Sequence, residues 1–242
     1  MTPMTPMTPI IHINLEKASQ TFFWSGSDDK ELWTANMKKA PQFFKDNGWD
    51  MEDAIEYQYN SHGFRCREFT DEPCYIVLGC SFIEGVGLPV HQTVPYILSY
   101  LLNSPVMNLG VGGASNDTCF RILDHYIDKL NVLGVFFLST FTDRCELIID
   151  DIPIVYTPMT APDQRDHIYL RWLMSAANAE NNRKKNLYAM RHLCSSNGVK
   201  LVECDVNDEL FTTTNGKARD MMHPNGQIMN ESANKFYEMW NT

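Results

Sequence analysis

Short apolar runs alternate with amphipathic stretches along most of the chain. The runs that have the length of buried strands are Tyr75–Leu78, Val106–Leu109, Val132–Leu138 and Val199–Cys204. Continuous apolar runs of this kind are typical of strands in a parallel sheet that is covered on both faces. The pattern therefore predicts a central sheet built from these segments.

Apolar residues recur at helical spacing between and after these runs. Helices are predicted at Thr93–Leu102, Asn116–Leu130, Gln164–Ser195 and Gln227–Trp240, and the third is expected to be interrupted near Asn178–Asn182. Strands that alternate with helices form a mostly parallel sheet with helices on both faces. We therefore expect one α/β domain over residues 71–242.

The first 70 residues do not follow this alternation. A Met-Thr-Pro unit repeats at the start, so residues 1–11 are predicted to be a disordered leader. Residues 12–70 are predicted to be an N-terminal extension packed on the core, with one helix between Asp28 and Phe44 and a strand at Ile55–Tyr59. Later in the chain, Leu147–Gln164 holds three prolines and is predicted to be a surface excursion.

Composition narrows the class of protein. A chain of 242 residues with 44% hydrophobic residues can bury the core of one large α/β domain. The net charge of −10 disfavours nucleic acid or an anionic membrane surface as the main partner, because an acidic protein repels phosphate at long range. No apolar run reaches the ~18 residues of a membrane span, and no secretory leader is evident. Seven dispersed cysteines favour free thiols in a reducing compartment, so a cytoplasmic location is expected.

Candidate catalytic residues follow the predicted strands. Ser81 follows the first strand, a glycine-rich segment at Asn108–Asn116 follows the second, and Asp220 and His223 precede the last helix. The carboxyl ends of parallel strands form one edge, where ligands bind. Serine becomes a nucleophile when an imidazole takes its proton and a carboxylate orients the imidazole, while backbone N–H groups hold the oxyanion. This machinery requires neither a metal nor a cofactor.

Three of these segments resemble a known family. Leu78–Phe82, Asn108–Ser115 and Asp220–Pro224 are similar to the first, second and fifth sequence blocks of the SGNH (GDSL-type) esterase and lipase superfamily. The resemblance covers the chain from Tyr75 to the C-terminus. It implies a flavodoxin-like three-layer α/β/α sandwich.

The resemblance also implies residue roles. It makes Ser81 the nucleophile, Asp220 and His223 its partners, and Gly113 a donor of an oxyanion N–H. The expected reaction is hydrolysis of short acyl esters, O-acetyl groups on carbohydrate included. The expected partner is thus a small-molecule or glycan ester.

Two positions depart from the family pattern. Cys80 stands where the family usually has aspartate, outside the triad. The third block usually supplies an asparagine as an oxyanion donor, but residues 139–144 contain none. Thr142 is the nearest positional match, and Asn116 is a second candidate, which otherwise serves only to cap its own helix. Loss of one donor typically costs ~100- to 1000-fold in rate, so a weak or inactive relative that keeps only the fold is the alternative.

Two further alternatives rank lower. Gly110–Ser115 nearly matches the dinucleotide-binding pattern G-x-G-x-x-G, but serine replaces the third glycine and no acidic residue ends a strand ~20 residues later. Cys80 is the other candidate nucleophile. Neighbouring side chains on an extended segment point to opposite faces, so only one of Cys80 and Ser81 faces the site, and Ser81 is preferred.

Overall fold

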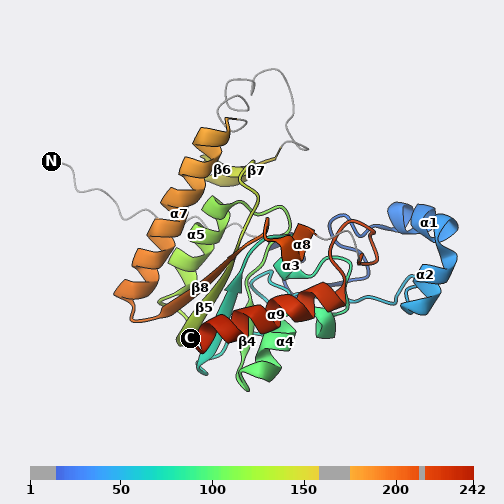
Figure 1. Cartoon of the computed structure of the whole chain (residues 1–242), viewed down its shortest axis with the longest axis horizontal. Helices are drawn as coiled ribbons and strands as arrows, with labels where there is room; N and C mark the ends of the chain where they lie inside the picture. The colour runs from blue at the N-terminus through green and yellow to red at the C-terminus, as the bar shows by residue number, and fades with distance from the viewer. Residues whose placement is uncertain (1–14, 158–174, 213–215) are drawn as a thin grey trace.

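The computed structural model describes residues 15–157, 175–212 and 216–242 (Figure 1). The predicted leader at residues 1–11 lies outside these ranges, as does the first part of the helix predicted from Gln164. None of the helices within the described ranges is both long and apolar enough to cross a membrane.

A parallel sheet forms the centre of the molecule. Its strands are β3 (Cys74–Leu78), β4 (Val106–Asn108), β5 (Val132–Ser139) and β8 (Lys200–Asp205), in the spatial order β4-β3-β5-β8. Every neighbouring pair is parallel. In chain order these strands lie second, first, third, fourth, which is the flavodoxin-like arrangement. The predicted α/β fold with a mostly parallel sheet is therefore confirmed.

Helices cover both faces of this sheet. On one side α4 (Val94–Leu101) packs beside α9 (Gly226–Trp240), and on the other α5 (Asn116–Tyr126) packs beside α7 (Ala176–Ser196) (Figure 1). Two buried hydrophobic clusters fill the spaces between the layers, one containing Phe136 and Phe236 and the other Ile76 and Met190. The molecule thus has three layers.

The helix α7 is continuous, so the predicted interruption near Asn178–Asn182 is wrong. The Asn182 and Asn186 amides both donate to the Asp117 carboxylate on α5, at 3.0 and 2.8 Å. These asparagines hold one helix against the other and do not end α7. Tertiary contacts of this kind override the weak helix propensity of asparagine.

The described part of the predicted surface excursion at Leu147–Gln164 contains a hairpin, and residues 158–164 lie outside the described ranges. The strands β6 (Cys145–Ile149) and β7 (Ile152–Tyr156) pair antiparallel. Asp150 and Asp151 join them with φ values of 50° and 65°. A two-residue turn with positive φ at both positions matches the twist of paired strands, and aspartate tolerates it better than most residues.

The N-terminal extension packs on the core. It contains η1 (Leu15–Lys17), a small sheet of β1 (Thr21–Phe22) with β2 (Tyr57–Gln58), and the helices α1 (Lys30–Lys39) and α2 (Pro41–Asp46). The single helix predicted there is two helices, because Pro41 has no N–H and disfavours helical backbone at Ala40. Trp33, Phe44 and Ile55 belong to the same buried cluster as Phe136 of β5.

Candidate active site

Ser81 lies directly after the central strand β3. Gly79 and Cys80 lead from β3 into α3 (Ser81–Glu84). The turn is so tight that a Cβ on Gly79 would lie 2.5 Å from the Ile83 Cγ1 atom, so glycine is required there. Cys80 is fully buried and Ser81 is partly exposed. Of these two candidate nucleophiles, only Ser81 is reachable from outside.

The structure brings Asp220 and His223 to Ser81. The Nε2 atom of His223 lies 2.7 Å from Ser81 Oγ, and its Nδ1 atom lies 2.5 Å from Asp220 Oδ2. Asp220 Oδ1 accepts hydrogen bonds from the backbone N–H groups of Met222 and His223, each at 3.0 Å. Met221 adopts a φ of 60° within this turn. The turn therefore places the carboxylate and the imidazole on the same side.

The carboxylate of Asp220 is fully buried but ionised. Burial by itself would raise its pKa, but hydrogen bonds and charge interaction with His223, together with the Ser27 hydroxyl, outweigh burial and lower the pKa to about 2. An ionised carboxylate beside Nδ1 favours the tautomer in which Nδ1 carries the proton. Nε2 is then an acceptor for the Ser81 hydroxyl proton.

The glycine-rich loop after β4 lies against α3. Val111 N–H donates to Gly79 O at 3.1 Å, and a Cβ on Gly110 would lie 2.6 Å from Glu84 N. Gly113 has a φ of 77°, a left-handed conformation that glycine adopts without strain. Its N–H donates no hydrogen bond to a protein group in the described ranges. The N–H of Ser81, at the first position of α3, has no acceptor within its own helix.

Asn116 joins α5 to the end of β5. Its Oδ1 accepts from Thr140 N–H at 2.8 Å, and its Nδ2 donates to Thr140 O at 3.3 Å. The cap of α5 is Ser115, so the interpretation of Asn116 as the cap of its own helix is wrong. Thr142 is half-buried in the turn after β5. An amide has a second N–H beyond the one bonded to Thr140, so Asn116 still has a donor for an oxyanion. Its role as an oxyanion donor stays a prediction.

Residues from the N-terminal extension also reach the site, and the sequence did not single them out. Ser27 Oγ donates to Asp220 Oδ2 at 2.6 Å, and Asn36 Nδ2 donates to the Asp220 carbonyl at 3.3 Å. The guanidinium of Arg219 pairs with Asp28 at 2.6 Å, and both side chains are fully buried. The Ser25–Asp28 segment has the composition of a turn, but nothing in it indicates a partner almost two hundred residues away.

Aromatic side chains lie beside the His223 imidazole. The Phe82 ring lies 5.4 Å from the His223 ring and 6.0 Å from the rings of both Phe141 and Phe211, measured between centroids. The imidazole of His223 is therefore bordered by aromatic rings.

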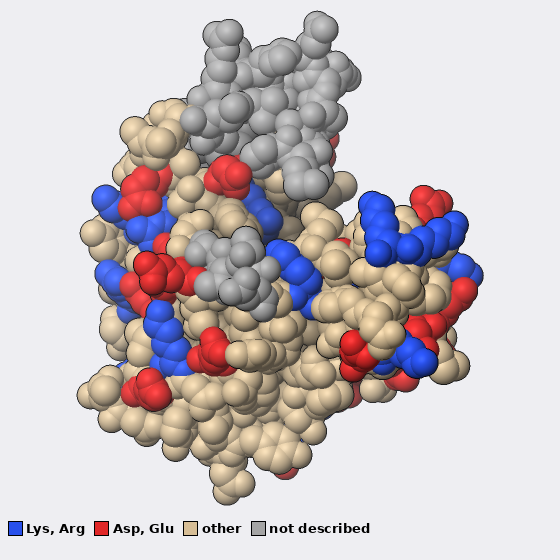
Figure 2. Space-filling model, turned by 45° about the vertical axis from the view of Figure 1, so that its right-hand side comes forward, with Lys and Arg blue, Asp and Glu red and all other residues tan. Residues whose placement is uncertain are grey.

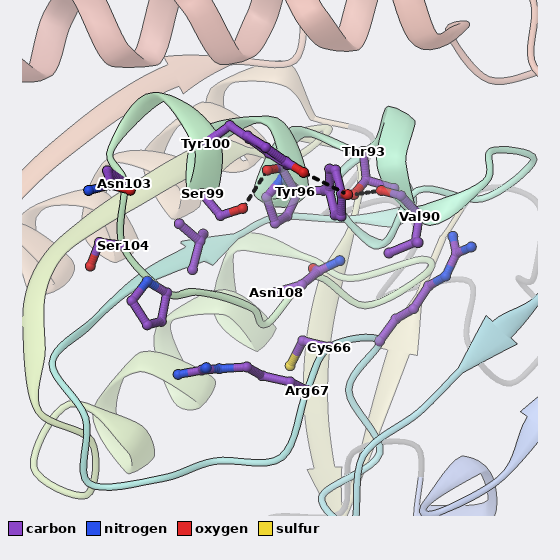
Figure 3. A pocket seen from close by; sticks show the side chains of 14 residues that line it. Cys66, Arg67, Val90, Thr93, Tyr96, Ser99, Tyr100, Asn103, Ser104 and Asn108 are labelled. Carbon is purple, nitrogen blue, oxygen red and sulfur yellow. Dashed lines mark hydrogen bonds between the residues drawn. The ribbon is translucent and has the colours of Figure 1, made fainter.

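A cavity beside α4 lies elsewhere on the molecule. It has a volume of about 620 Å³ and is bordered by Tyr96 and Tyr100 of α4, by Cys66 and Arg67, and by Asn108 at the end of β4 (Figure 3). None of the residues proposed for the triad lines it. Within the described ranges, no group of three or more His, Cys, Asp or Glu side chains is arranged to hold a metal ion.

Comparisons with known proteins give structural likenesses alone. No protein-family profile and no curated protein sequence matches the chain. The psychrotrophic esterase EstA from Pseudoalteromonas sp. is 13% identical, with a TM-score of 0.41 over 70% of this chain and 97% of that chain. TesA is 12% identical, with a TM-score of 0.44 over 70% and 97% of the two chains. A member of the lipolytic protein G-D-S-L family from Veillonella parvula DSM 2008 is 12% identical, with a TM-score of 0.35 over 68% and 97%. Similarities with TM-scores this low do not indicate a function for this chain.

Proposed function

We propose that the chain is a serine esterase that cleaves short acyl esters, O-acetyl groups on carbohydrate among them. The observation that carries the proposal is the continuous contact from Ser81 Oγ to His223 Nε2 at 2.7 Å and from His223 Nδ1 to Asp220 Oδ2 at 2.5 Å. A hydroxyl, an imidazole and a buried carboxylate in this order form the arrangement that acyl transfer requires.

In the proposed acylation step, Ser81 Oγ attacks the ester carbonyl carbon while His223 Nε2 takes its proton. The carbonyl oxygen becomes an oxyanion, which the N–H groups of Ser81 and Gly113 stabilise, with the Asn116 amide as third donor. The imidazolium then returns the proton to the departing alcohol oxygen, and the acyl group remains on Ser81. Deacylation repeats the sequence with water as the nucleophile, which releases the acid and free Ser81.

Asp220 supports both steps without changing protonation. Its pKa of about 2 keeps the carboxylate ionised across the neutral range. The negative charge stabilises the imidazolium that forms when His223 accepts the Ser81 proton. His223 is itself partly buried, its side chain 13% exposed, which strengthens this interaction relative to water.

The surroundings of Ser81 favour a short acyl group and an alcohol part of variable size. The Phe82, Phe141 and Phe211 cluster offers apolar contact next to the nucleophile. Ser81 itself is partly exposed and does not line the cavity beside α4, so the alcohol part of the ester extends toward solvent. A glycan bearing an acetyl group fits such an open site.

Labelling with a fluorophosphonate probe tests the proposal directly. We expect the probe to modify Ser81, as mapped by mass spectrometry of peptides, and we expect 4-nitrophenyl acetate to be hydrolysed at an unchanged rate in the presence of a chelator. Labelling of a different residue, or activity that a chelator removes and a divalent ion restores, would contradict the serine mechanism.

One observation favours a second candidate function. The Asn116 amide is already bonded to the Thr140 backbone, and residues 139–144 supply no other asparagine. A binding or structural protein that keeps the fold and has weak or no activity would not need a third oxyanion donor. Such a protein would bind ester ligands without labelling at Ser81.

Other features bear on partners and location. A nucleotide phosphate at the glycine-rich loop is disfavoured, because the Glu84 carboxylate lies 2.8 Å from where a Cβ on Gly112 would stand. Cys66, Cys74, Cys80, Cys119, Cys194 and Cys204 carry free thiols, and all of these except Cys66 are buried. Free thiols are typical of a reducing compartment, which supports the proposal of a cytoplasmic location.

A further inference from the structure

We propose that Ser27, in the N-terminal extension, is a positioning residue of the active site that orients the Asp220 carboxylate toward His223. This inference rests on the proposed function, because it assigns Ser27 a role in the same triad. Ser27 Oγ donates to Asp220 Oδ2 at 2.6 Å and lies 3.4 Å from His223 Nδ1. It therefore contacts both partners of the nucleophile.

A tight turn presents this hydroxyl. Ser25 N–H donates to Asp28 O at 3.0 Å and Asp28 N–H donates to Ser25 O at 3.1 Å, so Gly26 and Ser27 form the tip between two reciprocal hydrogen bonds. Gly26 has a φ of 61°, the left-handed conformation that such a tip uses. Ser27 is thus fixed by the backbone on both sides.

Both ends of the turn are anchored in the core. Asp28 pairs with the buried Arg219, next to Asp220 in the chain, and accepts a hydrogen bond from the Tyr57 hydroxyl at 2.5 Å. Ser25 Oγ lies 2.9 Å from the hydroxyl of Tyr59, which donates to the buried Glu84 of α3 at 2.6 Å. One turn of the extension is therefore connected to the nucleophile helix and to the loop that carries Asp220 and His223. In Figure 1 the chain of the extension runs beside α3 and the loop that precedes α9.

The hydroxyl completes the hydrogen bonding of a buried carboxylate. Oδ1 of Asp220 accepts two backbone N–H groups, while Oδ2 is shared by Ser27 and His223. The charged side chains on the surrounding elements are already engaged: Arg219 with Asp28, Glu84 with Lys17, and Lys217 with the Met222 carbonyl. Without the Ser27 donor, the Asp220 carboxylate is less stabilised, turns more freely and holds the imidazolium more strongly.

Replacement of Ser27 tests this role. We expect Ser27→Ala to lower kcat for 4-nitrophenyl acetate by about 10-fold, the scale of one lost charge-assisted hydrogen bond, with KM within about twofold. Because the imidazolium is held more strongly, the acid limb of the pH–rate profile moves to higher pH. Ser27→Thr keeps the hydroxyl, so its kcat and the pH of its acid limb should match those of the original chain.

The matched control is Ser61→Ala in the same extension. Ser61 Oγ also donates to a carboxylate, Glu68 Oε2, at 2.6 Å, but it is exposed and its partner is not a residue of the proposed triad. We expect this variant to keep the original rate and pH profile. Equal effects of Ser27→Ala and Ser61→Ala, or an unchanged pH profile in Ser27→Ala, would overturn the inference.

A second measurement does not depend on turnover. The pKa of His223 is followed by NMR titration in the full chain and in Ser27→Ala, with the signal assigned by its loss in His223→Ala. The inference requires that this pKa increase in Ser27→Ala. If the chain shows no ester turnover but the pKa moves, the proposed function fails and the positioning by Ser27 stands; if turnover is present and the pKa is unchanged, only the positioning fails.

Discussion

The hydroxyl of Ser81 has one polar side chain within hydrogen-bond distance in the described ranges, the imidazole of His223. That imidazole is held from behind by Asp220, whose own oxygens are held by backbone N–H groups and Ser27. Each residue thus fixes the orientation of the next. Groups that act as such a unit lose function together, and their losses do not add.

For this reason we expect Ser81→Ala and His223→Ala each to abolish turnover of 4-nitrophenyl acetate, and the double variant to be no worse than either. Asp220→Asn should lose as much or less, because it keeps the shape but removes the charge that stabilises the imidazolium. Steady-state kinetics measure the loss, and far-UV circular dichroism confirms that each variant folds. Unchanged turnover in Ser81→Ala would assign the activity to another residue.

Asn116 has a structural role and a predicted catalytic one. If its second N–H reaches the oxyanion, Asn116→Ala should lower kcat by ~100-fold with little change in KM. The variant also loses two hydrogen bonds to Thr140, so its thermal midpoint should fall. Thr142→Val, in the turn after β5, is the control and should change neither kcat nor KM.

The two roles of Asn116 are separated by measuring kinetics and thermal unfolding on the same preparations. A lower thermal midpoint with unchanged kcat would mean that Asn116 has only a structural role, which is to connect α5 to the end of β5. The oxyanion hole would then consist of the Ser81 and Gly113 N–H groups alone.

At the scale of elements, a buried ion pair joins the turn before α1 to the loop before α9. Arg219 contacts Asp28 with both side chains fully buried, donates to the Phe23 carbonyl at 2.6 Å, and lies 4.3 Å from the centroid of the Trp24 ring. Desolvation makes such a pair weak evidence of net stability, but removal of one partner leaves a charge buried without compensation.

Asp28→Asn should therefore lower the free energy of unfolding by about 3–5 kcal/mol, measured by urea denaturation. The control is Glu72→Gln, which removes an exposed pair with Arg67 at 2.7 Å, the side chains being 62% and 47% exposed. Exposed pairs contribute about 1 kcal/mol or less, so this variant should unfold close to the original. A similar decrease in the free energy of unfolding in both variants would mean that the buried pair contributes no more to stability than the exposed one.

At the scale of the whole molecule, the extension and the α/β core share one hydrophobic interior. Trp33, Phe44 and Ile55 of the extension are buried in the same cluster as Val77 and Phe136 of the sheet. The α1 and α2 helices project from the body as a lobe with mixed charges, and the surface between lobe and body is hollowed (Figure 2). A shared interior favours one cooperative unit in spite of this projecting shape.

Unfolding in urea tests that cooperativity. Three of the five tryptophans, Trp24, Trp33 and Trp49, lie in the extension, so tryptophan fluorescence follows it, whereas far-UV circular dichroism follows chiefly the longer helices of the core. We expect the two signals to change at the same urea concentration. A fluorescence transition at clearly lower urea would define residues 12–70 as a separate unit.

The sequence by itself determined the features that depend on local pattern. The apolar runs predicted all four strands of the parallel sheet within two residues at each end, because side-chain burial on both faces leaves a continuous apolar signature. The serine turn after β3 and the Asp220–His223 spacing could likewise be predicted, since each depends on a few residue types at fixed positions in a short segment. The three-layer arrangement was implied by the resemblance of these segments to a family, and the strand order β4-β3-β5-β8 came from the structure.

Only the tertiary structure decided which distant residues meet. Ser27 and Asp220 are separated by nearly the whole chain, and Asn116 bonds to a strand end that the pattern of its own helix does not reveal. The Asp150–Asp151 hairpin and the unbroken α7 were missed for the same reason, since asparagine, aspartate and proline favour loops until a partner satisfies them. Local propensities differ by less than about 1 kcal/mol per residue for all but proline, so packing and long-range hydrogen bonds determine the outcome wherever the two disagree.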